Sequence, residues 1–278
     1  METETKKLVS KELAAIVLFG GIAIFLLLGT GHADTHADAL DKIRETNQID
    51  ACYISYPPIS SKNISTGKIE GIGVEILESI AQKMGAKVNY VETTWANIAL
   101  DLRSGRCEIN VAGPYNLVER GYGGVVFSNP IGYAGNNALV KKGDKRFTSL
   151  EQLNNENVTV AVTEGEASHL WAKLHLPKAK LLVMSTGDIS LAFQQVLSGR
   201  ADVALGDATT IELFLRENDD LERMLKKDYL VRELTLPVNE DDLKFINFIN
   251  NAISGMRTSG ELAEIYSKYN YDSITLGG

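Results

Sequence analysis

The 278-residue sequence is poor in cysteine and histidine and has no excess of positive charge. Its two cysteines, Cys52 and Cys107, have no histidine or further cysteine at the spacing of a metal site, so we expect no metal centre. Asp and Glu outnumber Lys and Arg by 36 to 28, for a net charge of −8. This balance excludes the basic clusters that bind nucleic acids or anionic lipid headgroups.

The sequence also lacks the common catalytic signatures. It contains no Gly-x-Ser-x-Gly, no His-Glu-x-x-His and no P-loop motif. His169 and His175 are six positions apart on one expected helix, so they do not share a face as metal ligands would. The glycines of Gly71–Ile76 are too few for a dinucleotide fingerprint and follow no strand. We therefore expect no catalytic residues, no cofactor and no enzymatic activity.

Residues 13–31, "LAAIVLFGGIAIFLLLGTG", are a long uncharged run that follows Lys6, Lys7 and Lys11. A basic flank before an apolar core is typical of an export signal, with small residues near Ala33 and Ala37 for cleavage. The run is also long enough to span a bilayer. Residues 1–33 are therefore a signal peptide or a membrane anchor, and in both cases the remainder is exported.

Export leaves two states open for the cysteines. An oxidising compartment permits a disulfide between Cys52 and Cys107, which precede or lie in expected strands. Two buried free thiols are the alternative, and the sequence does not decide between them.

Strands and helices alternate twice along the exported part. Apolar patterning and glycine stops predict two successive βαβαβ units, followed by a helical tail with a break at Ser259-Gly260. The first unit comprises strands 49–55, 86–93 and 107–113 with helices 72–84 and 95–105. The second comprises strands 158–165, 180–186 and 201–207 with helices 167–177 and 188–199. Such alternation predicts parallel sheets with right-handed crossovers.

A ten-residue stretch occurs twice in similar form. "SGRCEINVAG" at Ser104–Gly113 and "SGRADVALGD" at Ser198–Asp207 each follow an expected helix and end in a strand that runs into a loop. Ligands of open parallel sheets bind beyond the carboxyl ends of the strands, so these loops are expected to face a binding cleft. Alternatively, any two α/β units could share this pattern.

Six motifs in order resemble those of the family 3 extracellular solute-binding proteins, the polar amino-acid receptors of ABC importers. The resemblance covers about Ile49–Tyr269. The motifs are "YPPIS" (56–60), "GIGVEILESIAQKMGAKVNYVETTW" (71–95), "LRSGRCEINVAG" (102–113), "ERGYGGVVFSNPIGY" (119–133), "VLSGRADVALGD" (196–207) and "SGELAEIYSKY" (259–269).

The resemblance implies an α/β fold of the two-lobed periplasmic-binding-protein type (type II). Each lobe would be a parallel-rich sheet flanked by helices, and two crossover strands near Gly132–Lys141 and Tyr229–Leu236 would join them. Lobe 1 would comprise residues 34–135 and 233–278, and lobe 2 residues 136–232. The protein would be a periplasmic monomer that delivers a small-molecule ligand to an ABC permease in the inner membrane, either cleaved or tethered through residues 13–31.

The resemblance also assigns two opposite charges to the ligand. An α-amino acid is a zwitterion, and the planar fork of an arginine suits its carboxylate. By resemblance, Arg120 would bind the carboxylate and Asp207 the ammonium, one from each lobe; the alternative is that both are surface charges. For the aromatic residues among the further candidates, core packing or a position at the rim of the cleft is the alternative. The further candidate ligand contacts are Tyr56, Trp95, Gly113, Tyr115, Glu166, Ala167 and Ser168.

Two departures from the family pattern put the ligand class in doubt. Where the family often has Gly-Thr-Thr, this chain has Gly165-Glu166-Ala167-Ser168, and Glu166 would repel a ligand carboxylate unless it answers a cationic side chain. Tyr115 stands where the family often has a small residue.

Two other functions remain as alternatives. Cyclohexadienyl dehydratases that act on prephenate or arogenate share this fold, but Thr210 stands where they carry an acid, three residues after Asp207. The other alternative is a membrane-tethered ligand sensor, which would use the same two lobes to signal to a partner.

Overall fold

The computed structural model describes residues 37–269 and 274–276. The expected signal peptide or anchor, residues 1–33, lies outside the described residues, so its nature stays a prediction. Within the part of the chain that is described, no helix has both the length and the apolar character needed to cross a membrane.

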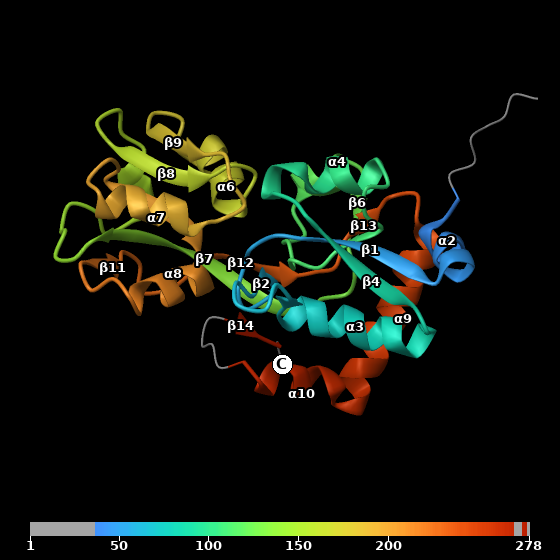
Figure 1. Ribbon diagram of the computed structural model, residues 1–278. Coiled ribbons are helices and arrows are strands. Elements are labelled where there is room, and N and C mark those ends of the chain that lie inside the picture. The colour runs from blue at the N-terminus through green and yellow to red at the C-terminus, as the bar shows by residue number, and fades with distance from the viewer. Residues whose placement is uncertain (1–36, 270–273, 277–278) are drawn as a thin grey trace, which may run out of the picture. The chain divides into compact units, whose positions relative to one another are not determined.

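Lobe 1 is organised by a parallel three-stranded sheet of order β4-β1-β5. Its elements are α2 (Ala39–Thr46), β1 (Gln48–Tyr53), β2 (Ser61–Lys62), β3 (Ile69–Glu70), α3 (Ile72–Met84), β4 (Lys87–Glu92), η1 (Trp95–Asn97), α4 (Ile98–Arg103), β5 (Ile109–Asn110), α5 (Val118–Tyr122), β6 (Val125–Val126), β13 (Val238–Asn239), α9 (Leu243–Ser259) and α10 (Glu261–Ser267). Helices α9 and α10, red in Figure 1, lie beside α3, and Lys83 of α3 pairs with Glu261 of α10 at 2.6 Å. The last two helices of the chain therefore return to lobe 1.

Lobe 2 is organised by a larger mixed sheet of order β11-β7-β10-β8-β9, in which β8, β9 and β10 are parallel and β7 is antiparallel to β10. Its elements are β7 (Gly132–Lys141), η2 (Leu150–Leu153), β8 (Thr159–Thr163), α6 (Ala167–His175), β9 (Lys180–Met184), α7 (Ser190–Leu197), β10 (Val203–Asp207), α8 (Ala208–Leu215), β11 (Leu221–Arg223) and β12 (Tyr229–Leu234). The first residues of β7 pair with β12 and with β14 (Ile274–Thr275), and its later residues pair with β10 and β11.

The predicted crossover segments correspond to β7 and β12, which are paired with each other (Figure 1). The residue limits of the two lobes stay a prediction. Two local expectations were wrong. Residues 95–105 do not form one helix but divide into η1 and α4, and the strand expected at 107–113 is only two residues long.

The repeated decapeptide has the same structure in both lobes. Each copy ends a helix, turns at a glycine of positive φ (Gly105 at +68°, Gly199 at +75°) and enters a strand. The acid of each copy accepts a hydrogen bond from a neighbouring strand of its lobe: Glu108 from the Asp50 N–H of β1 at 2.6 Å, and Asp202 from the Thr159 N–H of β8 at 2.9 Å. The repeat thus contributes to strand pairing in both lobes, and its last residues, Asp207 among them, lead to the candidate site.

Cys52 of β1 and Cys107, two residues before β5, form a disulfide, which resolves the alternative left open above. Both residues are buried, and the bridge closes a loop of 55 residues within lobe 1. A cross-link of this kind restricts the unfolded chain, so the double variant Cys52→Ala/Cys107→Ala should lose about 2–4 kcal/mol of unfolding free energy. Urea unfolding of both proteins under non-reducing conditions measures this loss. An unchanged unfolding midpoint would show that the bridge does not stabilise lobe 1.

Candidate functional site between the lobes

The two predicted charge anchors are both buried where the lobes meet. Arg120 on α5 of lobe 1 is 7% exposed, and Asp207 at the end of β10 of lobe 2 is 2% exposed. The Arg120 guanidinium donates through Nη1 to the Tyr115 carbonyl at 3.0 Å and through Nη2 to the Gly165 carbonyl at 3.1 Å. Because Gly165 belongs to lobe 2, Arg120 links the lobes. Burial lowers its pKa to about 10, which leaves it charged at neutral pH.

Asp207 caps a helix and also reaches across to lobe 1. Its Oδ1 accepts hydrogen bonds from the backbone N–H groups of Thr209 at 2.8 Å and Thr210 at 3.0 Å, at the start of α8. Its Oδ2 accepts a hydrogen bond from the Tyr115 hydroxyl at 3.1 Å. Burial raises the pKa of the Asp207 carboxyl and these hydrogen bonds lower it, leaving it above its ordinary value. Helix α8 was not expected from the sequence, although an aspartate before "ATTIELFL" is a typical helix start.

Tyr56 and Trp95 form the aromatic side of the site. Their rings meet edge to face with centroids 5.3 Å apart, and the Trp95 Nε1–H donates to the Gly187 carbonyl of lobe 2 at 3.0 Å. The Arg120 guanidinium carbon lies 5.9 Å from the centre of the Trp95 ring, which favours the cation. The buried Tyr56 hydroxyl makes no hydrogen bond within the described chain. Its pKa is raised by burial and next by the charge of Asp207.

Glu166 points into the protein, where it is 3% exposed and caps α6. One carboxylate oxygen accepts a hydrogen bond from the Ser168 N–H at 2.7 Å and the other from the Asn136 side-chain amide at 2.9 Å. The N–H of Gly165 donates to Nδ1 of His169 at 3.0 Å. The N–H groups of Gly165 and Ser168 at the start of α6 are therefore already paired with protein acceptors. Burial raises the pKa of Glu166 to about 7.

Two residues that the sequence analysis missed hold Glu166 and Ser168 in place. The Asn136 amide of β7 donates to both Glu166 and the Ser168 hydroxyl, at 2.9 and 2.6 Å, and the Tyr229 hydroxyl of β12 lies 3.2 Å from the Ser168 hydroxyl. A polar Asn136-Asn137 pair within the apolar strand Gly132–Lys141 was the available signal, because a buried amide needs polar partners.

Gly113 and Ala167 have less specific surroundings. A Cβ on Gly113 would meet the Ile59 and Leu234 side chains at 3.0 and 3.6 Å, so this glycine is packed among apolar groups. Ala167 is buried at the first position of α6, between Glu166 and Ser168. Neither supplies a charge or a side-chain hydrogen bond, and their role as ligand contacts stays a prediction.

Gly165 permits a close backbone approach between the lobes. It has φ of +74°, and a Cβ there would lie 2.4 Å from the backbone nitrogen of Ala96 in η1. The Gly165→Ala variant should therefore keep the lobes apart and weaken ligand binding at least about tenfold, because backbone atoms cannot move aside cheaply. Ligand titration together with small-angle X-ray scattering measures both effects. Gly85→Ala is the matched control, since Gly85 has φ of +71° but open space around its Cβ position. Equal behaviour of the two variants would contradict this account.

Buried polar atoms without a partner gather around these residues. Within the described ranges they include the Arg120 Nε, the Tyr56 hydroxyl and the Asn136 Oδ1. A buried polar group that lacks a hydrogen bond is costly. A small polar ligand held between the lobes would supply the missing donors and acceptors.

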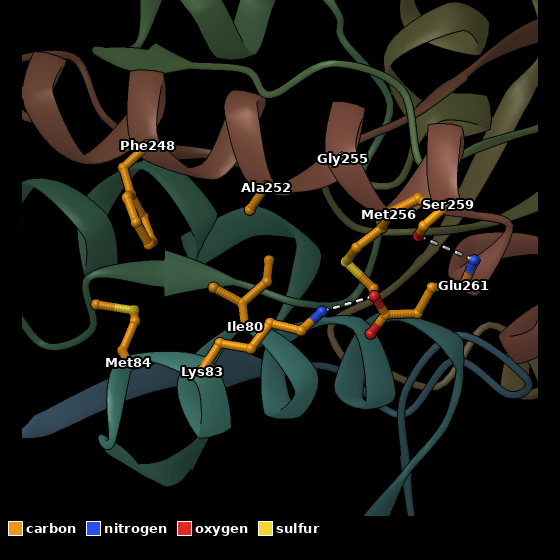
Figure 2. Close-up of a pocket in the computed structure, with 9 residues that line it drawn as sticks. All are labelled: Ile80, Lys83, Met84, Phe248, Ala252, Gly255, Met256, Ser259 and Glu261. Carbon is orange, nitrogen blue, oxygen red and sulfur yellow. Dashed lines mark hydrogen bonds and ion pairs between the residues drawn. The ribbon is translucent and has the colours of Figure 1, made fainter.

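A separate hollow of about 640 Å³ lies between α3 and α9 of lobe 1 (Figure 2). Figure 2 shows Ile80 and Met84 facing Phe248 and Ala252 across it, with the Lys83–Glu261 ion pair at one end. Its lining is mainly apolar and includes none of the predicted site residues. Over the described parts of the chain no cluster of His, Cys, Asp and Glu could hold a metal ion. The interlobe residues therefore remain the candidate site.

Comparison with known proteins agrees with the fold and adds functional relatives. The chain is 29% identical over 206 residues to a cyclohexadienyl dehydratase of Pseudomonas aeruginosa, covering 73% of this chain and 75% of that protein. It is 24% identical over 257 residues to an L-cystine-binding protein of Escherichia coli K12, covering 91% and 94%. An ancestral amino-acid-binding protein, described as a precursor of cyclohexadienyl dehydratase, superimposes with a TM-score of 0.74 at 30% identity, covering 84% of this chain and 99% of that chain.

Residues 49–272 match the sequence pattern of a single family over nearly the whole described chain. The two-lobed α/β architecture agrees with that match. The chain belongs to the bacterial extracellular solute-binding proteins, family 3.

Proposed function

We propose that the protein captures an α-amino acid, or a related small zwitterion, between its lobes as the binding component of an ABC importer. The observation that carries this proposal is the burial of opposite charges from the two lobes, Arg120 and Asp207, in one site. Arg120 would bind the ligand carboxylate and Asp207 its ammonium. The amino-acid-binding relatives support this assignment.

Because the two charges lie on opposite lobes, ligand binding and lobe closure are coupled. A zwitterion gains both contacts only when the lobes are closed, so it shifts the population to the closed state. The hydrogen bonds that already join the lobes include those of Tyr115 to Asp207, Arg120 to Gly165, and Trp95 to Gly187. The first of these occupies the Asp207 oxygen proposed to meet the ammonium. The ligand would therefore compete with or join the Tyr115 hydroxyl.

The proposal also includes the cellular location of the protein and the permease that receives its ligand. Family membership supports export, and the apolar run at residues 13–31 supplies the signal or tether. We propose a periplasmic monomer that passes its ligand to an inner-membrane permease. Sequencing the N-terminus of the exported protein distinguishes a cleaved protein from a tethered one, including the tethered sensor.

A dehydratase activity is the second candidate, and one observation favours it. Glu166 is a buried carboxyl whose pKa is raised to about 7, as a general acid near neutral pH requires. The P. aeruginosa relative adds to this support. Against it, the position three residues after Asp207 is Thr210, whose hydroxyl cannot replace a carboxylic acid as proton donor.

A thermal-shift screen against amino acids, amines and organic acids tests the main proposal. A ligand that binds only the folded state raises the unfolding temperature with its concentration. We expect at least one α-amino acid to do so. Incubation with prephenate and arogenate tests the alternative. Turnover of either compound would support the dehydratase activity in place of ligand capture for import. No shift with any α-amino acid would overturn the main proposal.

A further inference from the structure

Lobe 2 places two carboxylates in the interlobe site, against one guanidinium from lobe 1. Asp207 and Glu166 are 2% and 3% exposed, and Arg120 is 7% exposed. The negative charge of Asp207 raises the pKa of Glu166, and the positive charge of Arg120 stabilises the Glu166 carboxylate. With both acids ionised, the site carries one more negative than positive charge. A buried charge without a partner is strongly unfavourable.

A neutral amino acid does not remove this imbalance. Its carboxylate would pair with Arg120 and its ammonium with Asp207, as proposed above, and Glu166 would keep only neutral donors. Those donors are the Asn136 amide at 2.9 Å and the Ser168 N–H at 2.7 Å. A carboxylate accepts more than two hydrogen bonds, so Glu166 retains capacity for a cation.

One acceptor close to Glu166, the Oδ1 atom of Asn136, lacks a donor in the described part of the chain. Asn136 turns its amide nitrogen to Glu166 and Ser168, and its own Oδ1 is buried without a hydrogen bond to the described residues. The charged and titratable groups that act on Glu166, or on which it acts, are Asp207 on β10, Arg120 on α5, Tyr229 on β12, and Tyr56 and Tyr115 from lobe 1. Arg120 is the single cation of this set.

We propose that Glu166, positioned by Asn136, selects a ligand with a second cationic group, so that the captured zwitterion is an amino acid with an amine or guanidinium side chain. The side-chain cation would donate to the Glu166 carboxylate and to the Asn136 Oδ1. This inference rests on the proposed capture of an amino acid. Glu166, which departs from the family pattern, would then determine the ligand specificity of the site.

Arginine and citrulline are a matched pair of probes, because they have similar side-chain shapes and only arginine is charged. Calorimetric titration at pH 8 should show that arginine binds at least about tenfold more tightly than citrulline. If lysine is the ligand, it should bind more tightly than norleucine by the same factor. Glu166→Gln should bring that ratio close to one. Glu164→Gln removes a charge two positions away, outside the buried cluster, and should leave the ratio unchanged.

The pH dependence gives a second readout in the unaltered protein. The charged ligand requires ionised Glu166, whose pKa is about 7 in the folded protein, so the preference should fall as pH drops from 8 to 5.5. This pH measurement tests the role of Glu166 even if the Glu166→Gln variant fails to fold. A role limited to capping α6 would alter thermal stability in the variant without changing the ligand ratio.

The outcomes separate the two proposals. Binding of neutral or acidic amino acids in preference to cationic ones overturns the role of Glu166 and leaves amino-acid capture standing. An unchanged arginine-to-citrulline ratio in Glu166→Gln, or a ratio independent of pH, also overturns it. Failure to bind any α-amino acid removes both proposals.

Discussion

An Arg120→Ala variant should bind the proposed amino-acid ligand about 30-fold to several thousandfold more weakly than the unaltered protein. This range corresponds to about 2–5 kcal/mol, the loss expected when one partner of a buried, hydrogen-bonded charge pair is removed. Arg120 is proposed to hold the ligand carboxylate, and its hydrogen bond to the Gly165 carbonyl also joins the lobes. The variant thus loses a ligand contact and a closing contact together. Isothermal calorimetry with the ligand found by the thermal-shift screen measures the change.

Two further variants distinguish the guanidinium from general damage. Arg120→Lys keeps the charge but loses the planar fork, so it should recover only part of the affinity. Arg200→Ala removes an exposed arginine of the second repeated decapeptide and should bind as the unaltered protein does. Binding by Arg120→Ala within about threefold of the unaltered protein would show that Arg120 does not meet the ligand carboxylate, since a desolvated pair contributes more than that.

Loss of Arg120 should also change the titration of its neighbour. The guanidinium stabilises the ionised form of Glu166, opposing the burial that raises its pKa to about 7. Without Arg120, the pKa of Glu166 should therefore lie higher still. Carbon-13 NMR of the Glu166 carboxyl would follow this shift in the folded variant and separate it from a change in the ligand contact.

Local patterns were sufficient to predict the framework of the fold. The helix expected at 72–84 matches α3, and the break expected at Ser259-Gly260 divides α9 from α10. These features depend on apolar spacing and on glycine, both of which act within one or two turns of the chain. The repeated decapeptide was informative for the same reason, because helix end, turn and strand entry are all local.

Contacts between segments that are distant in sequence could not be predicted from these local patterns. Asn136 orients Glu166 across 30 positions of sequence, and Trp95 reaches Gly187 across 92. The pairing of Cys52 with Cys107 depends on β1 and β5 being neighbours in the sheet, which composition cannot specify. Glu166 departs from the family pattern in the sequence alone, but its burial beside Asn136 depends on β7 and α6 being neighbours in the fold.

The Asp207→Asn variant should lose ligand binding while keeping most of the stability of lobe 2. Asparagine is as good an N-cap as aspartate, so its side-chain oxygen can still accept from the N–H groups of Thr209 and Thr210. The negative charge proposed to hold the ammonium is absent, and affinity should fall by about 2–5 kcal/mol. Calorimetry measures the binding and urea unfolding measures the stability.

Asp207→Ala separates the two tasks of this residue, because it removes both the charge and the cap. It should bind as weakly as Asp207→Asn but lose about 1 kcal/mol more unfolding free energy. In both variants the pKa of Glu166 should fall, since the Asp207 charge contributes to raising it. Full binding by Asp207→Asn would mean that the Asp207 charge does not meet the ligand. Asp207 would then serve as a cap for α8 and a partner for Tyr115, and the interlobe site would need another anion for the ammonium, of which Glu166 is the nearest candidate.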